Sequence, residues 1–478
     1  MKHDLINPSL FGNDAGEDEP LEVLNSYFLE KPDFKPFFDL QTRLGFVRSR
    51  KGVGKSALLR QALFRRQLAD DGELLIYVKA SDLVALQNID LSSPSSLVHG
   101  WQQRICSRIN LALGSVLRVA FSDASMALVE QAEVSGFRGR NLVGSLLDRL
   151  RVKAVDVEIS RERVALGDSQ ALLSRFMQRR DIVVWLFIDD IDATFINTEQ
   201  ERLSVSTFFS ACRNLANSVG GLNIRASVRT DVWSIIAQYD EALDKCDQYM
   251  LDLKWSTEES GRILSNKIKS YFERTYGNVP KVDSISRLVF REPFRWGRVY
   301  IPSYKPIHIL SAGRPRWATH LCRLSGRLAH RVGHDLISIT EIRRSLKDYG
   351  QSRLSDLYKE HRHQCPKIEI LLEAFAGSSA RFTTAELLLK IQKDIIDRFG
   401  VPDIDSNGSD DPLLSIAHFL YRIGFLNARD ETLEDSTLGF VQFDLRPHLL
   451  SSSQNPDDGL NWEIHPSYRE VLRIGTIN

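Results

Sequence analysis

Residues 44–56 of this 478-residue chain read Leu-Gly-Phe-Val-Arg-Ser-Arg-Lys-Gly-Val-Gly-Lys-Ser, and they carry the strongest indication of its fold. The mostly apolar run 44–48 predicts a short buried strand. A turn that contains Gly52 and Gly54 follows it. Behind the turn, apolar residues recur at the spacing of an amphipathic helix, at Leu58, Leu59, Ala62, Leu63 and Phe64. A strand, a glycine-rich turn and a helix in this order predict a phosphate-binding loop, or P-loop.

The residue types of this loop suit a nucleoside triphosphate. Because Gly52 and Gly54 lack a Cβ atom, the backbone can wrap around phosphate and direct its N–H groups at it. The helix N-terminus adds partial positive charge. We expect Lys55 to reach the β- and γ-phosphates and the Ser56 hydroxyl to ligate magnesium. The candidate nucleotide-binding residues are Gly52, Val53, Gly54, Lys55, Ser56 and Ala57.

One position departs from the usual P-loop pattern. The first glycine, which normally stands five residues before Gly54, is Ser49 in this chain. A small residue suits that turn, so the P-loop interpretation stands. An ordinary basic turn between a strand and a helix is the alternative.

A second strand ends in acidic residues. The continuous apolar run 182–188 predicts a parallel strand that is buried on both faces. Asp189 and Asp190 follow it in a Walker B pattern. We expect Asp189 to ligate magnesium and Asp190 to orient or deprotonate the attacking water. Asp192 either supports this site or caps the next segment, and a solvated acidic loop is the alternative for all three.

A third strand is predicted by the run 224–231. Arg229 at its end would lie near the γ-phosphate, because α/β sheets bind ligands beyond the carboxyl ends of their strands. Arg229 is therefore a candidate sensor of the γ-phosphate, and Lys55, Asp190 and Arg229 form the candidate catalytic set. Alternatively, the residues around Arg229 form a turn that leads into a helix.

With these segments in place, the chain resembles prokaryotic P-loop ATPases of the additional-strand type, close to the STAND and origin-recognition-like AAA+ ATPases. The matching segments run in order along most of the chain: 52–56, 187–192, 228–231, 251–256 and 313–317. Segment 251–256 is similar to the last core strand, and 313–317 to the G-x-P or sensor-2 turn of the helical lid. Residues 11–12 and 15–17 also resemble the lead-in of a bacterial group that is often encoded beside effector genes in defence loci.

The resemblance implies an α/β fold with a P-loop NTPase parallel-sheet core, a helical lid and a C-terminal winged-helix-like domain. It implies ATP and Mg²⁺ as cofactors, and a homo-oligomer and a separate effector protein as partners. The lid turn of relatives touches the nucleotide, so Pro315 and Arg316 become candidate nucleotide contacts. A plain helix N-terminus with proline at its first position is the alternative.

Two departures from the family favour a slow switch over a rapid motor. Asp190 replaces the glutamate that is typical of fast AAA+ motors. The stretch between Ser56 and Asp189 is unusually long, with a strand at Leu74–Lys79 and a mostly helical insertion at about 93–180. Arg213 is our one candidate for an arginine finger.

Length and composition fit a globular chain of several domains, with 43% hydrophobic and 26% charged residues. We expect an N-terminal lead-in at 1–37, the ATPase core at 38–255, the helical lid at 256–345 and the winged-helix-like domain at 346–478. No apolar run approaches the ~20 residues of a membrane span, and no signal peptide is evident. Five scattered cysteines suit reduced thiols. We therefore expect a cytoplasmic protein without a membrane partner.

The lid sequence is basic. Between residues 262 and 362 there are 21 lysines and arginines and 8 acidic residues. The segment 290–300 interleaves Arg291, Arg295 and Arg298 with aromatic residues, a pattern that suits contact with phosphates and stacking on bases. A solvated basic face, or one that docks on an acidic protein, is the alternative.

The C-terminal region has the opposite charge. Helices are predicted near 368–375, from 383 to before 400 and at 413–423, and wing strands at 425–428 and 440–445. From residue 367 onward there are 10 basic and 18 acidic residues, and the third helix carries only His418 and Arg422 as basic groups. Because a DNA reader needs cations, a protein-contact role is favoured. His361, His363 and Cys365 alternate like metal ligands, but i and i+2 residues of a helix do not face each other, so a surface helix is expected.

Three functions follow from these observations. The first is an ATP-dependent switch that hydrolyses slowly and controls a separate effector in antiviral defence. The second is a nucleic-acid-binding AAA+ ATPase that uses the basic lid, and the third is a scaffold that holds nucleotide without turnover. No nuclease, protease or deaminase motif appears, so an effector activity would belong to another protein.

Overall fold

The computed structural model describes most of the chain as two compact units, which we treat separately. The sheet unit comprises residues 30–50 and 55–253, and the terminal unit comprises 1–29, 51–54 and 254–478. The described residues are 4–39, 41–69, 72–84, 93–116, 127–129, 131–132, 169–179, 182–297, 299–404, 411–432, 439–451 and 456–475. The middle of the insertion expected at 93–180 lies outside them.

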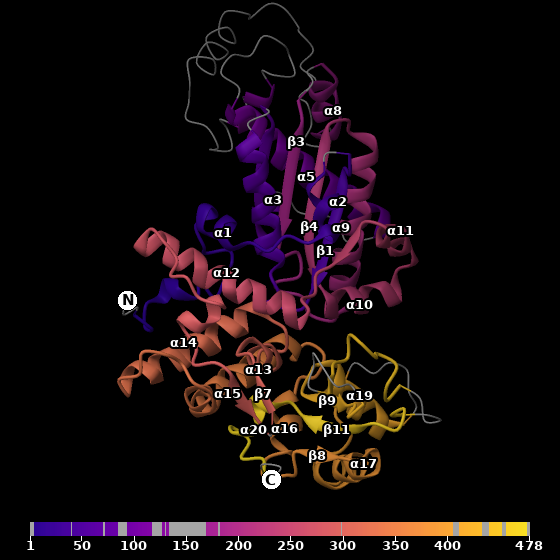
Figure 1. The fold of residues 1–478 in the computed structure, drawn as a ribbon. Helices are drawn as coiled ribbons and strands as arrows, with labels where there is room; N and C mark the ends of the chain where they lie inside the picture. The colour runs from indigo at the N-terminus through magenta and orange to yellow at the C-terminus, as the bar shows by residue number, and fades with distance from the viewer. Residues whose placement is uncertain are drawn as a thin grey trace, which may run out of the picture. The chain divides into compact units, whose positions relative to one another are not determined.

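The sheet unit is built on five parallel strands in the order β2-β3-β4-β1-β5. Figure 1 shows β3, β4 and β1 of this sheet. Their bounds are Leu44–Ser49 for β1, Leu74–Lys79 for β2, Val184–Asp189 for β3, Leu222–Arg229 for β4 and Met250–Asp252 for β5. Strand β4 lies between β1, which precedes the P-loop, and β3, which carries the acidic residues. This order confirms the P-loop core with an additional strand.

Helices cover both faces of this sheet, which explains why β3 is buried along its whole length (Figure 1). On one face, Val184, Leu186 and Ile188 of β3 join a core with α5 and α9. On the other face, Trp185 of β3 stacks with Phe187, and Arg66 of α3 lies over its ring. The helices of this unit are α2 (Lys35–Phe38), α3 (Lys55–Ala69), α4 (Ala80–Val84), α5 (Pro94–Val116), α8 (Ser169–Arg179), α9 (Glu199–Ser218), α10 (Thr230–Tyr239) and α11 (Asp244–Asp247).

A buried arginine fixes the chain segment that enters β1. Arg225 of β4 is fully buried, and its guanidinium donates to the backbone carbonyls of Phe37, Asp39 and Thr42. It also lies over the ring of Trp185 at 4.7 Å. Burial lowers the pKa of Arg225 to about 9. The carbonyl groups of the entering segment therefore find their hydrogen-bond donors inside the sheet unit.

The first half of the terminal unit is mostly helical. Its elements are α1 (Leu21–Tyr27), α12 (Thr257–Tyr276), β6 (Phe294–Trp296), β7 (Val299–Ile301), α13 (Tyr304–Leu310), α14 (Pro315–Arg331) and α15 (Ile339–His361). Capping boxes start α12 at Ser256 and α15 at Ser338. The sequence predicted helix throughout 256–345, but the structure has an antiparallel β6–β7 hairpin there. Helix α15 also continues beyond residue 345.

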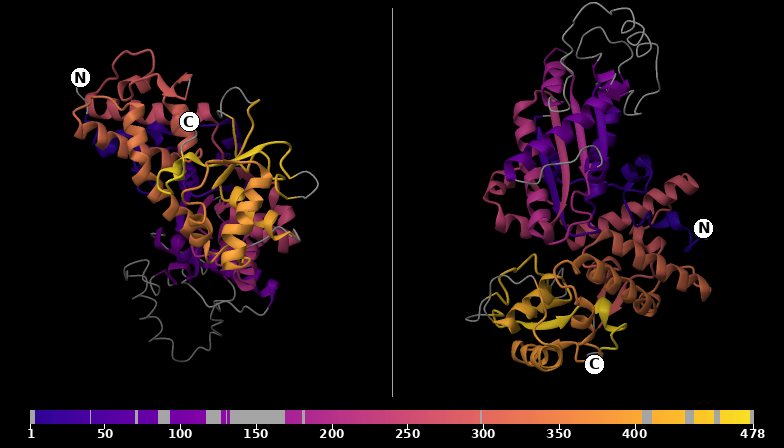
Figure 2. Two further views of the ribbon diagram at one scale, coloured as in Figure 1. Left: turned by 90° about the horizontal axis from the view of Figure 1, so that it is seen from below. Right: turned by 180° about the vertical axis from the view of Figure 1, so that it is seen from behind.

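The C-terminal part of this unit combines a sheet with helices (Figure 2). The sheet has four strands in the order β10-β9-β11-β8. Its elements are α16 (Ile368–Glu373), β8 (Arg381–Phe382), α17 (Thr384–Ile391), α18 (Asp397–Phe399), α19 (Pro412–Arg422), β9 (Leu426–Arg429), β10 (Phe440–Val441), β11 (Asn461–Ile464) and α20 (Pro466–Arg469). The expected helices are present, and β9 lies close to 425–428, where the first wing strand was expected. At 440–445, where the second wing strand was expected, β10 is only two residues long, and β11, which was not predicted, separates β9 from β8.

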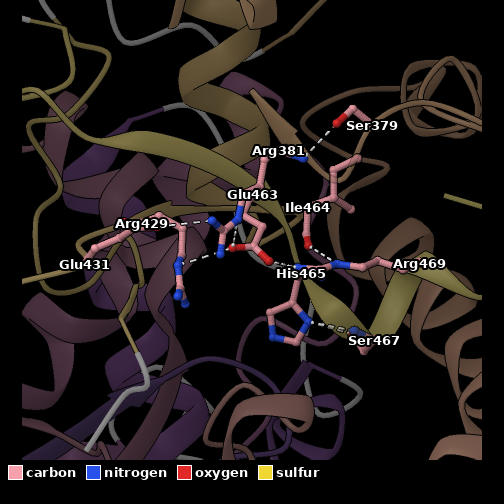
Figure 3. A network of polar contacts seen from close by, with 9 residues as sticks. All are labelled: Ser379, Arg381, Arg429, Glu431, Glu463, Ile464, His465, Ser467 and Arg469. Atoms are coloured by element: carbon pink, nitrogen blue, oxygen red, sulfur yellow. Dashed lines mark hydrogen bonds and ion pairs between the residues drawn. The ribbon is translucent and has the colours of Figure 1, made fainter. Parts of the chain in front are cut away.

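A buried carboxylate gathers arginines within this sheet (Figure 3). Glu463 of β11 is 3% exposed and pairs with Arg381 of β8 at 3.2 Å and Arg429 of β9 at 3.3 Å. Arg469 of α20 pairs with its other oxygen. A buried charge requires such partners. Three of the arginines of the C-terminal region are therefore engaged inside the fold.

The expectation of a surface helix at His361 and Cys365 was wrong. His361 is the last residue of α15 and is buried, where its Nδ1 shares a hydrogen bond with Gln364. Cys365 is fully buried in the C-terminal core, and burial raises the pKa of its thiol to about 11. The two residues with His363 do not form a group of metal ligands. All five cysteines are buried free thiols, and among the described helices none has the length and apolar character to cross a membrane.

Candidate functional site

The carboxyl edge of the parallel sheet holds Asp189 in a fixed orientation. Asp189 is 1% exposed at the end of β3. Its carboxylate accepts hydrogen bonds from the Tyr77 hydroxyl of β2 at 2.8 Å and from Ser227 Oγ of β4 at 2.5 Å. Burial, then the charge of Asp189, raises the pKa of Tyr77 far above its ordinary value, so this hydroxyl keeps its proton and remains a donor. Both neighbouring strands therefore position the predicted magnesium ligand.

Asp190 has a backbone conformation that is unusual for a residue with a side chain. Its φ of 59° lies in the left-handed region, which aspartate adopts more readily than most residues. In this conformation its N–H donates to Asp189 Oδ1 at 3.1 Å and to Ser227 Oγ at 3.3 Å. A carboxylate oxygen of Asp190 lies within 4.8 Å of one of Asp189. The turn thus brings both predicted carboxylates together at one edge.

Asp192 binds Arg229 of the next strand. Its carboxylate accepts from the Arg229 backbone N–H at 2.6 Å and from Nε at 3.1 Å. Arg229 Nη2 donates to the backbone carbonyl of Asp192 at 2.6 Å. Arg229 lies at the end of β4, as predicted, and α10 begins at the next residue. Asp192 therefore positions the candidate sensor.

Lys55 and Ser56 begin α3, directly after the glycine-rich turn. Lys55 is largely buried, and its Nζ donates to the backbone carbonyl of Ser49 at 3.2 Å. Ser49 is the last residue of β1 and pairs with Arg229 in the parallel register. Because Ser49 belongs to a strand, this position does not require glycine. The same edge of the sheet thus brings together Lys55, Asp189, Asp190 and Arg229.

The tip of the P-loop belongs to the terminal unit, where three successive carbonyls accept hydrogen bonds. The donors are Arg314 Nη1 to Lys51 at 3.3 Å, the Arg316 backbone N–H to Gly52 at 3.2 Å and Trp255 Nε1 to Val53 at 2.9 Å. These three hydrogen bonds fix the carbonyl groups of the loop tip within the terminal unit.

Glycine is required at Gly52. Its φ is +81°, and a Cβ atom there would lie 3.2 Å from Cβ of Arg316. Pro315 is the first residue of α14. This is the position that a plain helix N-terminus, the alternative to a nucleotide contact, predicts for it. Arg316 lies against the loop through its backbone and the start of its side chain, and its guanidinium has no ionic partner within the described part of the chain. It remains a candidate nucleotide contact.

A buried ion pair lies behind the loop tip. Arg314 is 2% exposed and pairs with Glu360, near the end of α15, at 2.8 Å. Its guanidinium also lies 4.1 Å from the ring centre of Trp317. The pair therefore links α15 to the carbonyl of Lys51.

Four residues with contacts at these sites were not predicted from the sequence: Tyr77, Ser227, Trp255 and Arg314. Tyr77 and Ser227 each stand two residues before the end of their strand, but only the strand order reveals that both flank Asp189. Trp255 lies within the segment 251–256, which resembles the last core strand of the ATPases named above, and its indole N–H was the available signal. Arg213, the candidate arginine finger, lies half-buried on α9, and nothing in the structure tests that role.

Comparisons with known proteins give distant similarities. No family model matches the chain. It is 20% identical over 499 aligned positions to the "Putative transposon gamma-delta 80.3 kDa protein" of Escherichia coli (strain K12), a match that covers 96% of this chain and 66% of that protein.

Solved structures of origin recognition complex proteins are also similar. The ORC2 protein of Aeropyrum pernix with ADPNP and ADP has 12% identity and a TM-score of 0.41, over 90% of this chain and 88% of that one. The ORC1 protein of Aeropyrum pernix in complex with DNA has 14% identity and a TM-score of 0.36, over 95% and 89%. Drosophila ORC bound to DNA has 11% identity and a TM-score of 0.33, over 96% and 90%.

Proposed function

We propose that this chain binds ATP with Mg²⁺ and hydrolyses it slowly, as a switch. The observation that carries the proposal is the arrangement around Asp189, a buried carboxylate fixed by Tyr77 and Ser227 at the end of the parallel sheet. A P-loop sequence follows β1 of the same sheet. Buried charge that is positioned by polar groups at a sheet edge is typical of functional sites.

The residues fit a hard divalent cation, because Asp189 and Ser56 supply oxygen ligands. Bound there, Mg²⁺ would neutralise negative charge on the triphosphate. The backbone N–H groups from Gly52 to Ala57 and the ammonium of Lys55 bind the phosphates. Asp190 orients the attacking water and accepts its proton. Arg229, held by Asp192, and Arg316 report the γ-phosphate to the rest of the chain.

The output of this switch is control of a separate effector by a homo-oligomer in the cytoplasm, within bacterial antiviral defence. Asp190 in place of glutamate and the long insertion support slow turnover. The engaged arginines around Glu463 support a protein contact for the C-terminal part, because they leave fewer cations for phosphate. The similarity to the transposon protein of Escherichia coli supports the idea that the gene for this chain is carried on mobile DNA.

Calorimetry and an ATPase assay test the nucleotide site. We expect ATP to bind the chain in the presence of Mg²⁺, and Lys55→Ala to abolish that binding. Lys245→Ala, which removes an exposed lysine of the same unit, is the matched control and should bind normally. A folded wild-type chain that takes up no nucleotide would refute the proposal. Unchanged behaviour of Asp190→Asn would favour a scaffold without turnover.

Nucleic-acid binding is a second candidate function, and the β6–β7 hairpin favours it. Phe294 and Ile301 pair across the strands and face the core, 1% and 8% exposed. Arg295 and Tyr300 form the next pair on the opposite face, where Tyr300 is 69% exposed. A cation beside an exposed aromatic ring suits a phosphate and a base. Arg298 lies outside the described residues.

This second function has its own experiment. Binding of a fluorescent single-stranded oligonucleotide is measured against salt concentration, for wild type and for the triple change of Arg291, Arg295 and Arg298 to alanine. We expect the triple change to reduce both affinity and salt dependence, by about 0.7 in the log–log slope for each lost phosphate contact. The control removes three exposed cations of the C-terminal part, Lys367, Lys393 and Arg398. No binding at low salt would eliminate this function.

A further inference from the structure

The terminal unit contains a polar cavity of about 510 Å³ beside the start of α14. Its walls come from α14, α15 and the N-terminal segment at Asp14. The charged and polar groups that matter are Arg316, His320, Arg353, Ser355, Asp356 and Lys359. Among the residues proposed to contact ATP, Arg316 lines this cavity, and Lys55, Asp190 and Arg229 do not.

Arg353 is the buried charged residue in the wall of this cavity. It is 4% exposed, and its guanidinium lies over the rings of Trp317 at 4.4 Å and Tyr349 at 5.1 Å. Nη2 donates to His320 and to Asp356, both at 3.1 Å. Nε and Nη1 are buried and have no hydrogen-bond partner within the described ranges. Buried donors without acceptors are costly, so an arginine in this state is suited to an added acceptor.

His320 contributes a donor rather than a charge. A guanidinium only donates hydrogen bonds, so Nδ1 of His320 accepts from Arg353. The proton of the neutral ring is then on Nε2. Burial, and next the positive charge of Arg353, lower the pKa of His320. The histidine is therefore neutral at physiological pH.

The cavity has an excess of positive charge. Asp356 is paired with Arg353, and Asp14 is paired with Arg323 at 3.1 Å. Arg316 and Lys359 are both exposed and have no ion-pair partner in the part of the chain that the structure describes. Two cations without counterions thus flank an arginine with unmet donors.

From this geometry we propose that the cavity is a second anion site, which binds a small phosphate-bearing molecule. A phosphate group carries more than one negative charge and accepts hydrogen bonds in several directions. Arg353, Lys359 and the Ser355 hydroxyl offer donors from different positions along α15, and Arg316 adds a charge from α14. The volume is sufficient for a ligand the size of a nucleoside monophosphate. This site does not require the proposed ATPase function.

The site is connected to the P-loop through Arg316. The same residue that lines the cavity donates its backbone N–H to Gly52 and lies against that glycine. A ligand that binds the guanidinium of Arg316 is therefore expected to influence the conformation of the loop at Gly52. The expected consequence is that the second anion changes ATP affinity.

Calorimetry on the full chain tests this inference in a Lys55→Ala background, where the P-loop is disabled. Inorganic pyrophosphate is expected to bind with one site per chain. Lys359→Gln and Arg353→Lys are each expected to weaken binding about tenfold, the effect of one charge-assisted hydrogen bond. Lys347→Gln, on the same helix but not in the cavity wall, is the control and should bind normally.

Circular dichroism shows whether each variant is folded. If Arg353→Lys does not fold, Lys359→Gln still tests the inference, because Lys359 is exposed. AMP and ribose 5-phosphate are titrated in parallel; tighter binding of AMP assigns a nucleotide, and equal binding assigns a phosphate alone. Absence of binding in the Lys55→Ala chain would overturn the inference. Equal pyrophosphate affinity of the Lys55→Ala chain with and without Lys359→Gln would overturn it as well, whether or not the P-loop of the wild type binds ATP.

Discussion

Asp192 holds Arg229 by its carboxylate, which accepts from both the backbone N–H and Nε of the arginine. Asp192 stands three residues after Asp189, and Arg229 two residues after Ser227, which donates to Asp189. The strands β3 and β4 are thus joined twice at their carboxyl ends. The candidate metal ligand and the candidate sensor are parts of one hydrogen-bonded structure.

Asp192→Asn should therefore slow hydrolysis without preventing nucleotide binding. Asparagine removes the charge that orients the guanidinium, and we expect turnover to fall about tenfold or more. ATP affinity, which depends on the P-loop, should change little. Steady-state turnover and calorimetry measure the two quantities.

The control for this change is Asp247→Asn, which alters an exposed aspartate that lies 3.7 Å from Arg48 in the same unit. It should leave both quantities unchanged. Full turnover by Asp192→Asn would contradict a role for Arg229 that depends on this pair.

Ser227→Ala should weaken Mg²⁺ binding. The serine hydroxyl donates to Asp189 at 2.5 Å, and loss of a group that orients a metal ligand typically costs about 10-fold or more in metal affinity. The Mg²⁺ concentration at half-maximal ATPase activity should rise accordingly. Ser234→Ala, at an exposed serine of α10, is the matched control. An unchanged Mg²⁺ dependence would show that Tyr77 alone suffices.

Local signals explain the part of this site that the sequence predicts. The glycine-rich turn, the apolar run before Asp189 and the short run before Arg229 each lie within a few residues, and each strand appears where it was expected. The capping box at Thr383 likewise starts α17. Such features are encoded by neighbouring residues, so a single sequence is sufficient to find them.

Pairings over long distances in the chain explain what the sequence does not predict. Tyr77 is 112 residues from Asp189, and only the order β2-β3-β4 brings them together. The β6–β7 hairpin was hidden because its strands have three residues each, too few for a clear alternation. His361 and Cys365 looked like surface residues because their burial depends on the C-terminal core.

Buried histidines predict loss of stability in acid. Burial lowers the pKa of His308 and of His418 to about 4, and that of His465 to about 3. Between those values and the ordinary pKa of about 6.5, the unfolded chain binds more protons than the folded one. The free energy of unfolding should therefore decrease as pH falls from 6.5 to 4, by about 1.4 kcal/mol per pH unit for each histidine.

Urea unfolding at several pH values measures this slope, and His418→Gln should reduce it by one histidine's share. The glutamine keeps a hydrogen-bonding side chain near the carbonyl of Pro447, which His418 contacts. An identical slope in the variant and the wild type would show that His418 titrates normally in the folded chain.

The Arg314–Glu360 pair supports the last prediction, which separates stability from nucleotide binding. Glu360→Gln leaves the buried guanidinium of Arg314 without its counterion, and such a change costs about 3–5 kcal/mol. Asp283→Asn breaks the exposed pair with Arg287, where a loss of less than about 1 kcal/mol is expected.

The double change Arg314→Met with Glu360→Leu removes both charges and should recover much of the stability. Because methionine cannot donate the hydrogen bond that Arg314 makes to the Lys51 carbonyl, the double variant should have a lower ATP affinity than the wild type. The urea midpoint and calorimetric affinity of the four proteins decide the matter, and a double variant with normal ATP affinity would show that Arg314 serves the fold alone.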